Sequence, residues 1–368
     1  MLDDRDVVLK GSQLAGLSVD LVVAGGIAAV EAPKLIRELR RYGASVRVFM
    51  TASACKFITP LSLEWASRQS VVTDLSGSAE HIASSDMVVV APATLDFVGK
   101  ASWGLADSAA LTLVQSALQR LPVFFAPSMH ESLSQNPLFQ ENKRRLSKLK
   151  NVFFLDPVAA EGKMKAQGFE SMVARICHLA GSASQLRGQK VGLTLGPTRS
   201  IVDDVRYLSN RSSGAMGLAI ADELYRRGAD VYSIAGPLQP SWPEFLQKVD
   251  VETNGEMHRE LSQIVARKKP SALIFAAAVL DFDVESARSG KTSSAGGFEV
   301  SLRPSKKIIH SFAKFKGVKV GFKLESQISE KSLVLRARES LKQHQLSFVV
   351  ANRLEDVSKT AHRAFLVF

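Results

Sequence analysis

Short apolar runs alternate with amphipathic segments along the whole chain. A run that is apolar throughout predicts a strand buried on both faces, and apolar residues at helical spacing predict a helix packed on the sheet. This alternation is typical of the βαβ units that build parallel sheets. The predicted strands are 19–23, 46–50, 87–91, 123–126 and 152–155 in the first half, and 191–195, 231–235, 272–276, 318–322 and 348–351 in the second.

Amphipathic segments between these runs predict helices at 33–43, at 110–120 and from Met216 onward. The sequence therefore predicts an α/β chain made of two doubly wound, Rossmann-like domains. In such folds, ligands bind at the carboxyl ends of the strands. The polar segment of small residues around 180–190 predicts the boundary, which gives domains at 1–183 and 184–368.

Composition fits two globular domains: the chain has 368 residues, of which 46% are hydrophobic and 23% charged. No apolar run approaches the roughly 20 residues of a membrane span, and the first residues do not resemble a signal peptide. Cys55 and Cys177 cannot form a disulfide framework and lack the spacing of a metal site. We therefore expect a cytoplasmic protein that has no membrane partner.

The formal net charge of +11 raises the possibility of nucleic-acid binding. The basic residues are spread over several predicted helices, however, and aromatic residues do not accompany them. This distribution favours solvated helix faces and small phosphate-bearing ligands over nucleic acid.

One segment, 194–217 (TLGPTRSIVDDVRYLSNRSSGAMG), joins a predicted strand to a predicted helix. A glycine- and serine-rich turn before a helix can bind an anion, because the first N–H groups of the helix are unpaired. From the residues alone, an ordinary loop with a helix cap is an equally good interpretation. The segment's small and polar residues are Gly196, Pro197, Ser209, Asn210, Ser212, Ser213 and Gly214, and its cations are Arg199, Arg206 and Arg211.

The pattern GPTR followed by DxVRYxSNxSSGxMG resembles the signature of phosphopantothenate–cysteine ligase. That enzyme is the second half of the bifunctional coenzyme A biosynthesis flavoprotein, whose first half is phosphopantothenoylcysteine decarboxylase. The first half of this chain resembles the homo-oligomeric flavin-containing cysteine decarboxylases. The matching stretches are AGGIAAVEAPKLIREL (24–39), MTASACKFITPLSL (50–63), EHIASSD (80–86), VVVAPATLDFVGK (88–100) and GLADSAA (104–110).

The resemblance implies a flavodoxin-like N-terminal domain that binds FMN in a homo-oligomer whose flavin sites form between subunits. His81 stands at the position of the family's catalytic histidine. His130, in PSMHESL, stands where the family has an asparagine that binds the substrate carboxylate. The implied FMN-binding residues are Gly25, Gly26, Thr51, Phe57, Thr59, Ala91, Pro92, Ala93 and Thr94.

One departure concerns the decarboxylase half. The family's substrate-covering flap carries a cysteine that completes the final reduction. The corresponding stretch here, DPVAAEGKMKAQGF (156–169), contains no cysteine. We therefore expect decarboxylation to be weak or lost.

The resemblance implies that the second half activates 4′-phosphopantothenate with CTP and Mg²⁺, and that the amine of cysteine then attacks the acyl-cytidylate. Asn210 would contact that intermediate, and Lys291 would lie on a loop over the acyl phosphate. Asp281 would lie beside the nucleotide and the metal. The other implied substrate-binding residues are Gly196, Arg206, Ser212, Ser213, Gly214, Lys306, Lys307 and Phe322.

Two positions in this half also depart from the family. Ala215 replaces a lysine, and SKKI (305–308) replaces an NPDI motif, so that Lys306 and Lys307 would hold phosphate by charge. An alternative interpretation is a non-catalytic flavin-binding regulatory or scaffold protein derived from this family. A nicotinamide oxidoreductase is a weaker alternative, because the glycine turn at Gly25 and Gly26 lacks the full GxGxxG pattern.

Overall fold

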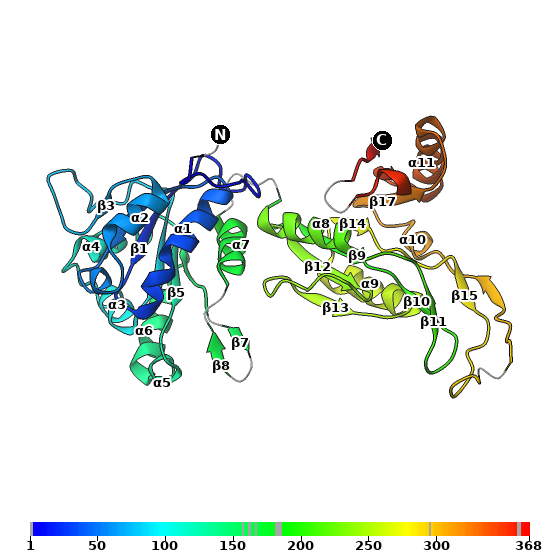
Figure 1. Ribbon diagram of the computed structural model, residues 1–368, viewed down its shortest axis with the longest axis horizontal. Coiled ribbons are helices and arrows are strands. Elements are labelled where there is room, and N and C mark those ends of the chain that lie inside the picture. Colours follow the sequence, from blue (N-terminus) through cyan, green and yellow to red (C-terminus); the bar gives the residue numbers. More distant parts are fainter. Residues whose placement is uncertain are drawn as a thin grey trace. The chain divides into compact units, whose positions relative to one another are not determined.

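The chain forms two compact units, Met1–Ser184 and Gln185–Phe368. The computed structural model describes residues 3–156, 158–160, 163–165, 168–180, 186–293, 296–358 and 362–368. The predicted boundary between residues 183 and 184 lies outside these ranges. Each unit has its own sheet and its own hydrophobic clusters, and each is described by itself (Figure 1).

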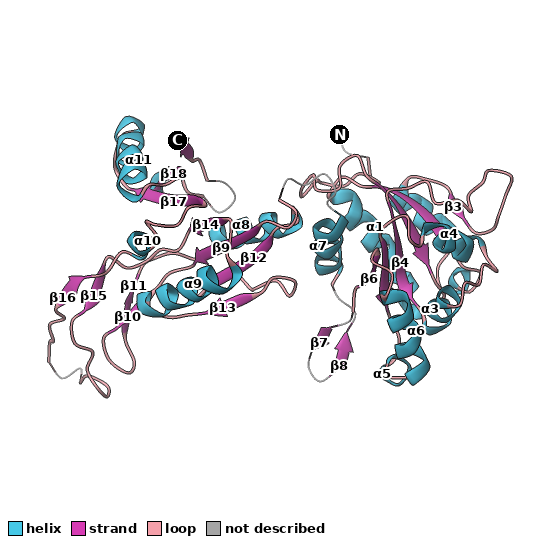
Figure 2. Ribbon diagram, turned by 180° about the vertical axis from the view of Figure 1, so that it is seen from behind, coloured by secondary structure: helices cyan, strands magenta, loops and turns pink. Residues whose placement is uncertain are grey.

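A parallel sheet in the order β3-β2-β1-β4-β5-β6 forms the centre of the first unit (Figure 2). Without the two-residue β3, the order corresponds to the 2-1-3-4-5 arrangement of flavodoxin-like folds. The chain direction across the sheet reverses between β1 and β4, which opens a crevice at their carboxyl ends. The strands are β1 (Ser18–Val23), β2 (Ser45–Met50), β3 (Val71–Val72), β4 (Met87–Ala93), β5 (Val123–Pro127) and β6 (Val152–Phe154), with a separate pair β7 (Val158–Ala160) and β8 (Lys163–Lys165).

Helices cover both faces of this sheet, because successive strand residues point to opposite sides. Val19 and Leu21 belong to the cluster that includes α1, α2 and α7, whereas Val22 belongs to the cluster that includes α3, α4 and α6. The helices are η1 (Ile27–Glu31), α1 (Ala32–Arg41), η2 (Ala54–Lys56), α2 (Pro60–Ser67), α3 (Leu95–Ser102), α4 (Ala109–Ala117), α5 (Glu131–Ser134), α6 (Pro137–Ser147) and α7 (Phe169–Ala180).

The second unit has a sheet in the order β13-β12-β9-β14-β17-β18-β19, which is parallel except for the final edge strand. Its switch point lies between β9 and β14. Two separate strand pairs, β10–β11 and β15–β16, follow the ends of β9 and β14 (Figure 2). The strands are β9 (Lys190–Leu195), β10 (Arg199–Ile201), β11 (Tyr207–Ser209), β12 (Asp230–Ala235), β13 (Lys248–Asp250), β14 (Ala272–Phe275), β15 (Phe282–Val284), β16 (Leu302–Pro304), β17 (Val318–Glu325), β18 (Phe348–Arg353) and β19 (Phe365–Val367).

Separate hydrophobic clusters anchor the helices of this unit: one contains α8, a second contains α9 and α10, and a third joins α11 to β18 and β19. A capping box starts α9, where the Thr253 side chain accepts from the Glu256 N–H and the Glu256 side chain accepts in return. The helices are α8 (Ala215–Arg226), α9 (Asn254–Lys268), α10 (Ile308–Ser311), α11 (Glu330–His344) and η3 (Leu354–Asp356).

Every predicted strand and helix is present, with ends that differ by a few residues. The predicted loop at 196–214 is more ordered than expected, because it contains the antiparallel pair β10–β11. The strands that the pattern missed are all short, and most lie outside the two main sheets or at their edges. In the part of the chain that the structure describes, no helix combines the length and the apolar character needed to cross a membrane.

Candidate functional sites

Tight glycine contacts shape the crevice at the switch point of the second unit. Gly196 and Gly214 both have left-handed backbones, with φ of +76° and +78°. A Cβ added at Gly214 would lie 2.1 Å from Leu238 Cδ2 and 3.2 Å from Gly196 Cα. A Cβ at Gly236 would lie 1.8 Å from the Pro197 carbonyl oxygen. Only glycine fits these positions, so the loop after β9 packs directly against the start of α8.

The predicted phosphate-binding residues gather at the N-terminus of α8. Gly214 is the N-cap of this helix, so its first turn carries the partial positive charge of the helix end. The Ser212 Oγ accepts from the Gly214 N–H at 3.3 Å, and the Ser213 Oγ accepts from the Ala215 N–H at 3.3 Å. Hydroxyl and N–H groups thus share one small surface, which is suited to an anion.

Asn210 bridges the two sides of the crevice. Its side chain is exposed, and its Nδ2 donates to the carbonyl oxygens of Ala278 (3.1 Å) and Val279 (3.2 Å) just beyond β14. Ser209, its neighbour, donates from Oγ to the Thr198 carbonyl oxygen at 2.9 Å. The end of β11 is therefore attached to the ends of both β9 and β14.

A buried polar network lies beneath these loops. The Thr198 hydroxyl, fully buried, donates to Asn254 Oδ1 at 2.6 Å and accepts from the Leu280 N–H at 3.0 Å. Asn254 Nδ2 donates to the Leu280 carbonyl oxygen at 3.0 Å and to Ser305 Oγ at 2.6 Å. One side chain at the start of α9 thus holds the three loops that carry the predicted ligand-binding residues.

The predicted nucleotide residues lie along the mouth of the crevice. The Ser305 N–H donates to the Asp281 carbonyl oxygen at 2.8 Å, which brings the two lysines of the SKKI loop beside Asp281. Lys307 and Asp281 form an ion pair, and Lys306 is exposed. Half-buried Phe322 lies on the neighbouring β17, opposite Val350.

Asp281 is the predicted metal ligand. Within the described ranges, no group of three or more His, Cys, Asp or Glu side chains could hold a metal ion. A lone exposed carboxylate does match Mg²⁺, which protein sites commonly bind through one or two carboxylates together with substrate phosphates. Asp281 would have to exchange Lys307 for the metal in order to do so.

Arg206 and Lys291 come together through a third residue, which sequence reasoning missed. Asp203 is buried and accepts from Arg206 Nη1 at 2.6 Å and from the Thr292 N–H at 3.1 Å. Lys291, adjacent to Thr292, is exposed. Asp203 is the first letter of the quoted DxVRY pattern, so a signal for it was present, but an aspartate before a hairpin also suits an ordinary turn.

A cavity of about 760 Å³ opens at the switch point of the first unit. Of the predicted FMN-binding residues, Gly25, Gly26, Thr51 and Thr94 line it. A Cβ at Gly25 would lie 2.2 Å from Ser53 Cβ, so the turns after β1 and β2 are in close contact. Hydroxyl groups and strand-end backbone therefore surround a space within the size range of cofactor sites.

The other predicted FMN-binding residues do not line this cavity. Ala91, Pro92 and Ala93 are buried in β4, where the Pro92 carbonyl oxygen accepts from the Ala24 N–H at 3.4 Å. Exposed Phe57 and Thr59 follow η2, and Thr59 is the N-cap of α2. The structure thus brings only part of the predicted set around one space.

Six polar lining residues were not predicted individually, namely Ser53, Asp96, Lys100, Asp107, Ser108 and Ser128. Lys100 Nζ lies 3.2 Å from Asp107 Oδ2 and 3.4 Å from Asp96 Oδ2. The Asp107 carboxylate, and after it that of Asp96, raises the pKa of the Lys100 ammonium group. Residues 107 and 108 lie in GLADSAA, so that quoted match contained a signal for them. The cavity mouth therefore has a cation held between two acids.

Neither of the two predicted histidines is among the described residues that line the cavity. His81 is exposed on the loop before β4 and, among the described residues, is not part of the cavity lining. His130 is the N-cap of α5, and its Nδ1 accepts from the Ser132 N–H at 3.2 Å. Its neighbours Met129 and Leu133 do line the cavity. His130 is thus at the rim, whereas a single copy of the chain leaves His81 outside.

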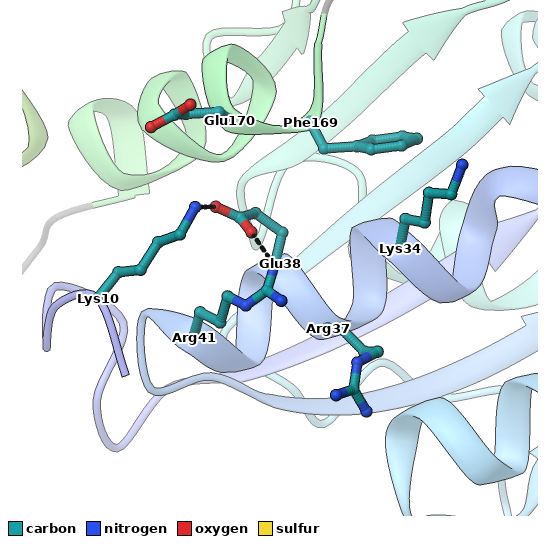
Figure 3. Close-up of a pocket in the computed structure, with 7 residues that line it drawn as sticks. All are labelled: Lys10, Lys34, Arg37, Glu38, Arg41, Phe169 and Glu170. Carbon is teal, nitrogen blue, oxygen red and sulfur yellow. Dashed lines mark hydrogen bonds and ion pairs between the residues drawn. The ribbon is translucent and has the colours of Figure 1, made fainter. Parts of the chain in front are cut away.

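A second cavity of about 360 Å³ lies between α1 and the start of α7 (Figure 3). Its centre is the Glu38 carboxylate, which accepts from Lys10 Nζ at 2.7 Å and from Arg41 Nη1 at 2.8 Å. Arg37 Nη2 donates to the Asp6 carbonyl oxygen at 2.9 Å. These cations bind acceptors within the protein, so we interpret the cluster as a structural link between the N-terminal segment and α1.

Replacing Glu38 with glutamine is expected to destabilise the first unit at neutral pH by about 1–3 kcal/mol, since hydrogen bonds to charged groups are lost. Burial opposes ionisation of this side chain, which is 6% exposed, but its bonds from Lys10 and Arg41 lower the pKa of the carboxyl group. A lowered folded-state pKa stabilises the fold above the ordinary value near 4.3 and loses that effect as pH falls below it. The variant's deficit should therefore shrink as the pH falls below about 4.3.

Urea unfolding at several pH values measures this effect. Glu31→Gln is the matched control, because it removes the exposed pair with Lys34, whose Nζ–Oε2 distance is 2.6 Å. Exposed pairs contribute at most about 1 kcal/mol. Equal losses in the two variants, or a Glu38→Gln deficit that does not change with pH, would contradict the prediction.

Comparison with known protein families covers both units separately. Residues 10–181 match the family described as "Flavoprotein", and residues 186–365 match "DNA/pantothenate metabolism flavoprotein C-terminal domain". A solved structure described as the DNA/pantothenate metabolism flavoprotein from Streptococcus pneumoniae is 25% identical, with a TM-score of 0.44, and it covers 49% of this chain and 89% of its own.

Whole-chain relatives span both units. The coenzyme A biosynthesis bifunctional protein CoaBC of Thermococcus kodakarensis is 36% identical, over 97% of this chain and 90% of the relative. The protein of the same name from Methanocaldococcus jannaschii is 32% identical, over 94% of this chain and 87% of the relative. With this identity along nearly its whole length, the chain belongs to the CoaBC family of coenzyme A biosynthesis bifunctional proteins.

Proposed function

We propose that the second unit joins 4′-phosphopantothenate to cysteine with CTP, through an acyl-cytidylate. The observation that carries this proposal is the convergence at one switch point of Asn210, the N-terminus of α8 and the Asp281–Lys307 pair. Such a crevice offers separate places for a phosphate, an acyl group and a nucleotide. The family membership of the chain supports the same assignment.

Each part has a distinct chemical task. Ser212, Ser213 and the first N–H groups of α8 bind the phosphate of 4′-phosphopantothenate, and Arg206 adds positive charge. Asn210 is proposed to meet the acyl carbonyl: its Nδ2 would exchange the hydrogen bond to Ala278 or Val279 for one to the acyl oxygen, and so stabilise the negative charge that develops there. The amine of cysteine then attacks, and CMP leaves.

Lys306 and Lys307 hold the nucleotide phosphates, in place of the hydrogen-bonding loop that the family uses. Asp281 is the residue that would hold Mg²⁺, which when bound neutralises phosphate charge. Lys291 approaches the acyl phosphate from the segment next to Thr292. Phe322 offers its ring to the cytosine base from the adjacent strand.

We further propose that the first unit binds FMN in its 760 Å³ cavity. The cavity fits this group because its lining provides the hydroxyls of Thr51, Ser53 and Thr94 and a glycine turn whose backbone has no room for a side chain. FMN, when bound, supplies the redox chemistry that a cysteine decarboxylase needs. The protein's part is to hold the cofactor and to position the substrate, with His130 at the rim.

The placement of His81 supports a homo-oligomer. In one chain this histidine lies outside the cavity, on an exposed loop. Exposed apolar side chains, including Ile27 at 74%, lie beside the cavity mouth. We therefore propose that a second copy covers this mouth and brings its own His81 to the site.

Decarboxylation is proposed to be weak or absent. Cys55 is exposed and follows β2, and Cys177 is fully buried in α7. Neither lies in the stretch at 156–169 that corresponds to the family's flap. Without a thiol there, the final reduction lacks the residue that the family uses for it.

Product analysis tests both halves at once. Purified protein is incubated with 4′-phosphopantothenate, cysteine, CTP and Mg²⁺, and the products are identified by mass. We expect phosphopantothenoylcysteine to accumulate together with CMP and pyrophosphate. Conversion to 4′-phosphopantetheine would overturn the proposal about the first unit. No product with either CTP or ATP would favour the non-catalytic flavin-binding scaffold, to which the missing cysteine and Ala215 point.

A further inference from the structure

We propose that Asp203 is a positioning residue whose buried carboxylate holds the Arg206 guanidinium beside the backbone next to Lys291. Binding of the substrate phosphate by Arg206 and placement of Lys291 then both depend on this one carboxylate. This inference rests on the proposed function of the second unit, which assigns ligand roles to Arg206 and Lys291. Asp203 itself faces the protein and has no assigned contact with substrate.

Both oxygens of the Asp203 carboxylate accept hydrogen bonds. Its side chain has no exposed surface. Oδ1 accepts from the N–H groups of Val205 (2.9 Å) and Arg206 (2.8 Å), and Oδ2 accepts from Arg206 Nη1 (2.6 Å) and the Thr292 N–H (3.1 Å). One carboxylate therefore organises its own turn and reaches across to a segment almost ninety positions later in the chain.

The carboxylate remains charged despite its burial. Burial raises the pKa of Asp203, but the hydrogen bonds from Val205, Thr292 and Arg206 outweigh it and hold that pKa well below its usual range. A buried charge is costly unless hydrogen bonds satisfy it fully. Turn formation alone would not require a buried charge, because an exposed aspartate or a serine can close the same turn.

The segment that carries Lys291 is attached to the 202–206 turn at further points. The Gly290 N–H donates to Asp204 Oδ2 at 2.9 Å, and the Arg288 N–H donates to the Val202 carbonyl oxygen at 2.9 Å. Lys291 itself is exposed between two anchored neighbours. Its backbone is thereby held, while its side chain extends into solvent.

Arg206 links the two parts directly. Its Nη1 donates both to Asp203 Oδ2 and, at 3.2 Å, to the Thr292 carbonyl oxygen. The same guanidinium that would meet a substrate phosphate therefore also fixes the residue after Lys291. Loss of the Asp203 charge should therefore free both the Arg206 guanidinium and the backbone next to Lys291.

The test compares Asp203→Asn with Asp204→Asn in the full-length protein. Asparagine keeps the shape of the side chain but directs an NH₂ group at N–H donors. For Asp203→Asn we expect the ligase kcat to fall about 10–100-fold, the range for hydrogen bonds to a buried charge. The KM for 4′-phosphopantothenate should rise several-fold, about 5-fold or more, while the KM for cysteine stays the same.

Asp204→Asn is the matched control. Asp204 is the neighbouring carboxylate, but it is exposed, and asparagine at this position keeps an oxygen that can accept the one bond from the Gly290 N–H. We expect its kcat and KM values to stay within about 2-fold of wild type. A rise of all KM values together with a lowered melting temperature in Asp203→Asn would show a general structural role and overturn the inference.

Coupling to Lys291 is tested in a double variant. If Asp203 acts through Lys291, adding Asp203→Asn to Lys291→Ala should lower kcat by less than about 2-fold, because coupled effects are not additive. Fully multiplicative losses would contradict the inference.

A readout that needs no activity separates this inference from the proposed function. Trypsin should cleave after Arg288 and Lys291 about 10-fold faster in Asp203→Asn than in Asp204→Asn, because local opening exposes the segment. If the wild-type protein has no ligase activity but the Asp203→Asn variant is still cleaved faster than Asp204→Asn, the structural role of Asp203 stands and the ligase proposal is wrong. Equal cleavage rates in the two variants would overturn the inference whatever the activity.

Discussion

Replacing Asn210 with alanine is expected to lower ligase turnover by about 100-fold or more, the loss measured when an enzyme loses one donor to a developing oxyanion. Asn210 reaches from the end of β11 to the carbonyl oxygens of Ala278 and Val279, so its amide lies between the two sides of the crevice. Alanine removes both the amide and this bridge. The KM for CTP should change far less than kcat, because the nucleotide residues lie on other loops.

Pyrophosphate release in a single turnover without cysteine measures the first half-reaction, and steady-state formation of phosphopantothenoylcysteine measures the complete reaction. His81→Ala is the control, since His81 belongs to the first unit and to a different proposed reaction. It should leave ligase turnover within about 2-fold of wild type. Equal losses in the two variants would contradict a model with two independent sites.

Replacing Thr198 with valine is expected to destabilise the second unit by about 2–5 kcal/mol. Valine has nearly the same shape but cannot donate to Asn254 Oδ1 or accept from the Leu280 N–H. Each buried group left unsatisfied costs about 1–3 kcal/mol. For a unit of this size, the corresponding fall in melting temperature is about 4–20 °C.

Calorimetry measures that fall, and hydrogen exchange assigns it, because peptides around Leu280 should lose protection more than those of the first unit. The matched control is Ser209→Ala, which removes a half-buried hydroxyl that donates to the Thr198 carbonyl oxygen at 2.9 Å. This control removes a single hydrogen bond from a partly exposed side chain, so we expect a loss of about 1 kcal/mol. A Thr198→Val protein as stable as this control would show that the network contributes little.

The sheets could be predicted from the sequence because their strands are apolar on both faces. Residues 87–91, for example, are apolar and buried throughout, and a continuous apolar run of this length has few other solutions. The short edge and hairpin strands could not be predicted in the same way. β10 and β11 carry polar and exposed residues, and backbone pairing rather than hydrophobic burial defines them.

For the sites, motif resemblance indicated which loops matter but not how they are joined. Asn254 shows the difference: it lies outside every quoted motif, yet its side chain holds the loops of Thr198, Leu280 and Ser305. A single asparagine after a threonine reads locally as the start of a helix, and that reading is also correct. Its second task depends on contacts between residues far apart in sequence, which local pattern cannot reveal.

The strand order also has a consequence for synthesis on the ribosome. All main strands of the first sheet and both of its hydrophobic clusters precede residue 185, so this unit can fold while the second is still being made. In the second unit, β9 emerges first but lies at the centre of its sheet, and it pairs with β12 and then with β14, whose Ala272 lies opposite Val191. The nascent β9 must therefore wait unpaired on both edges, which makes this interval the one in which a chaperone would be most useful.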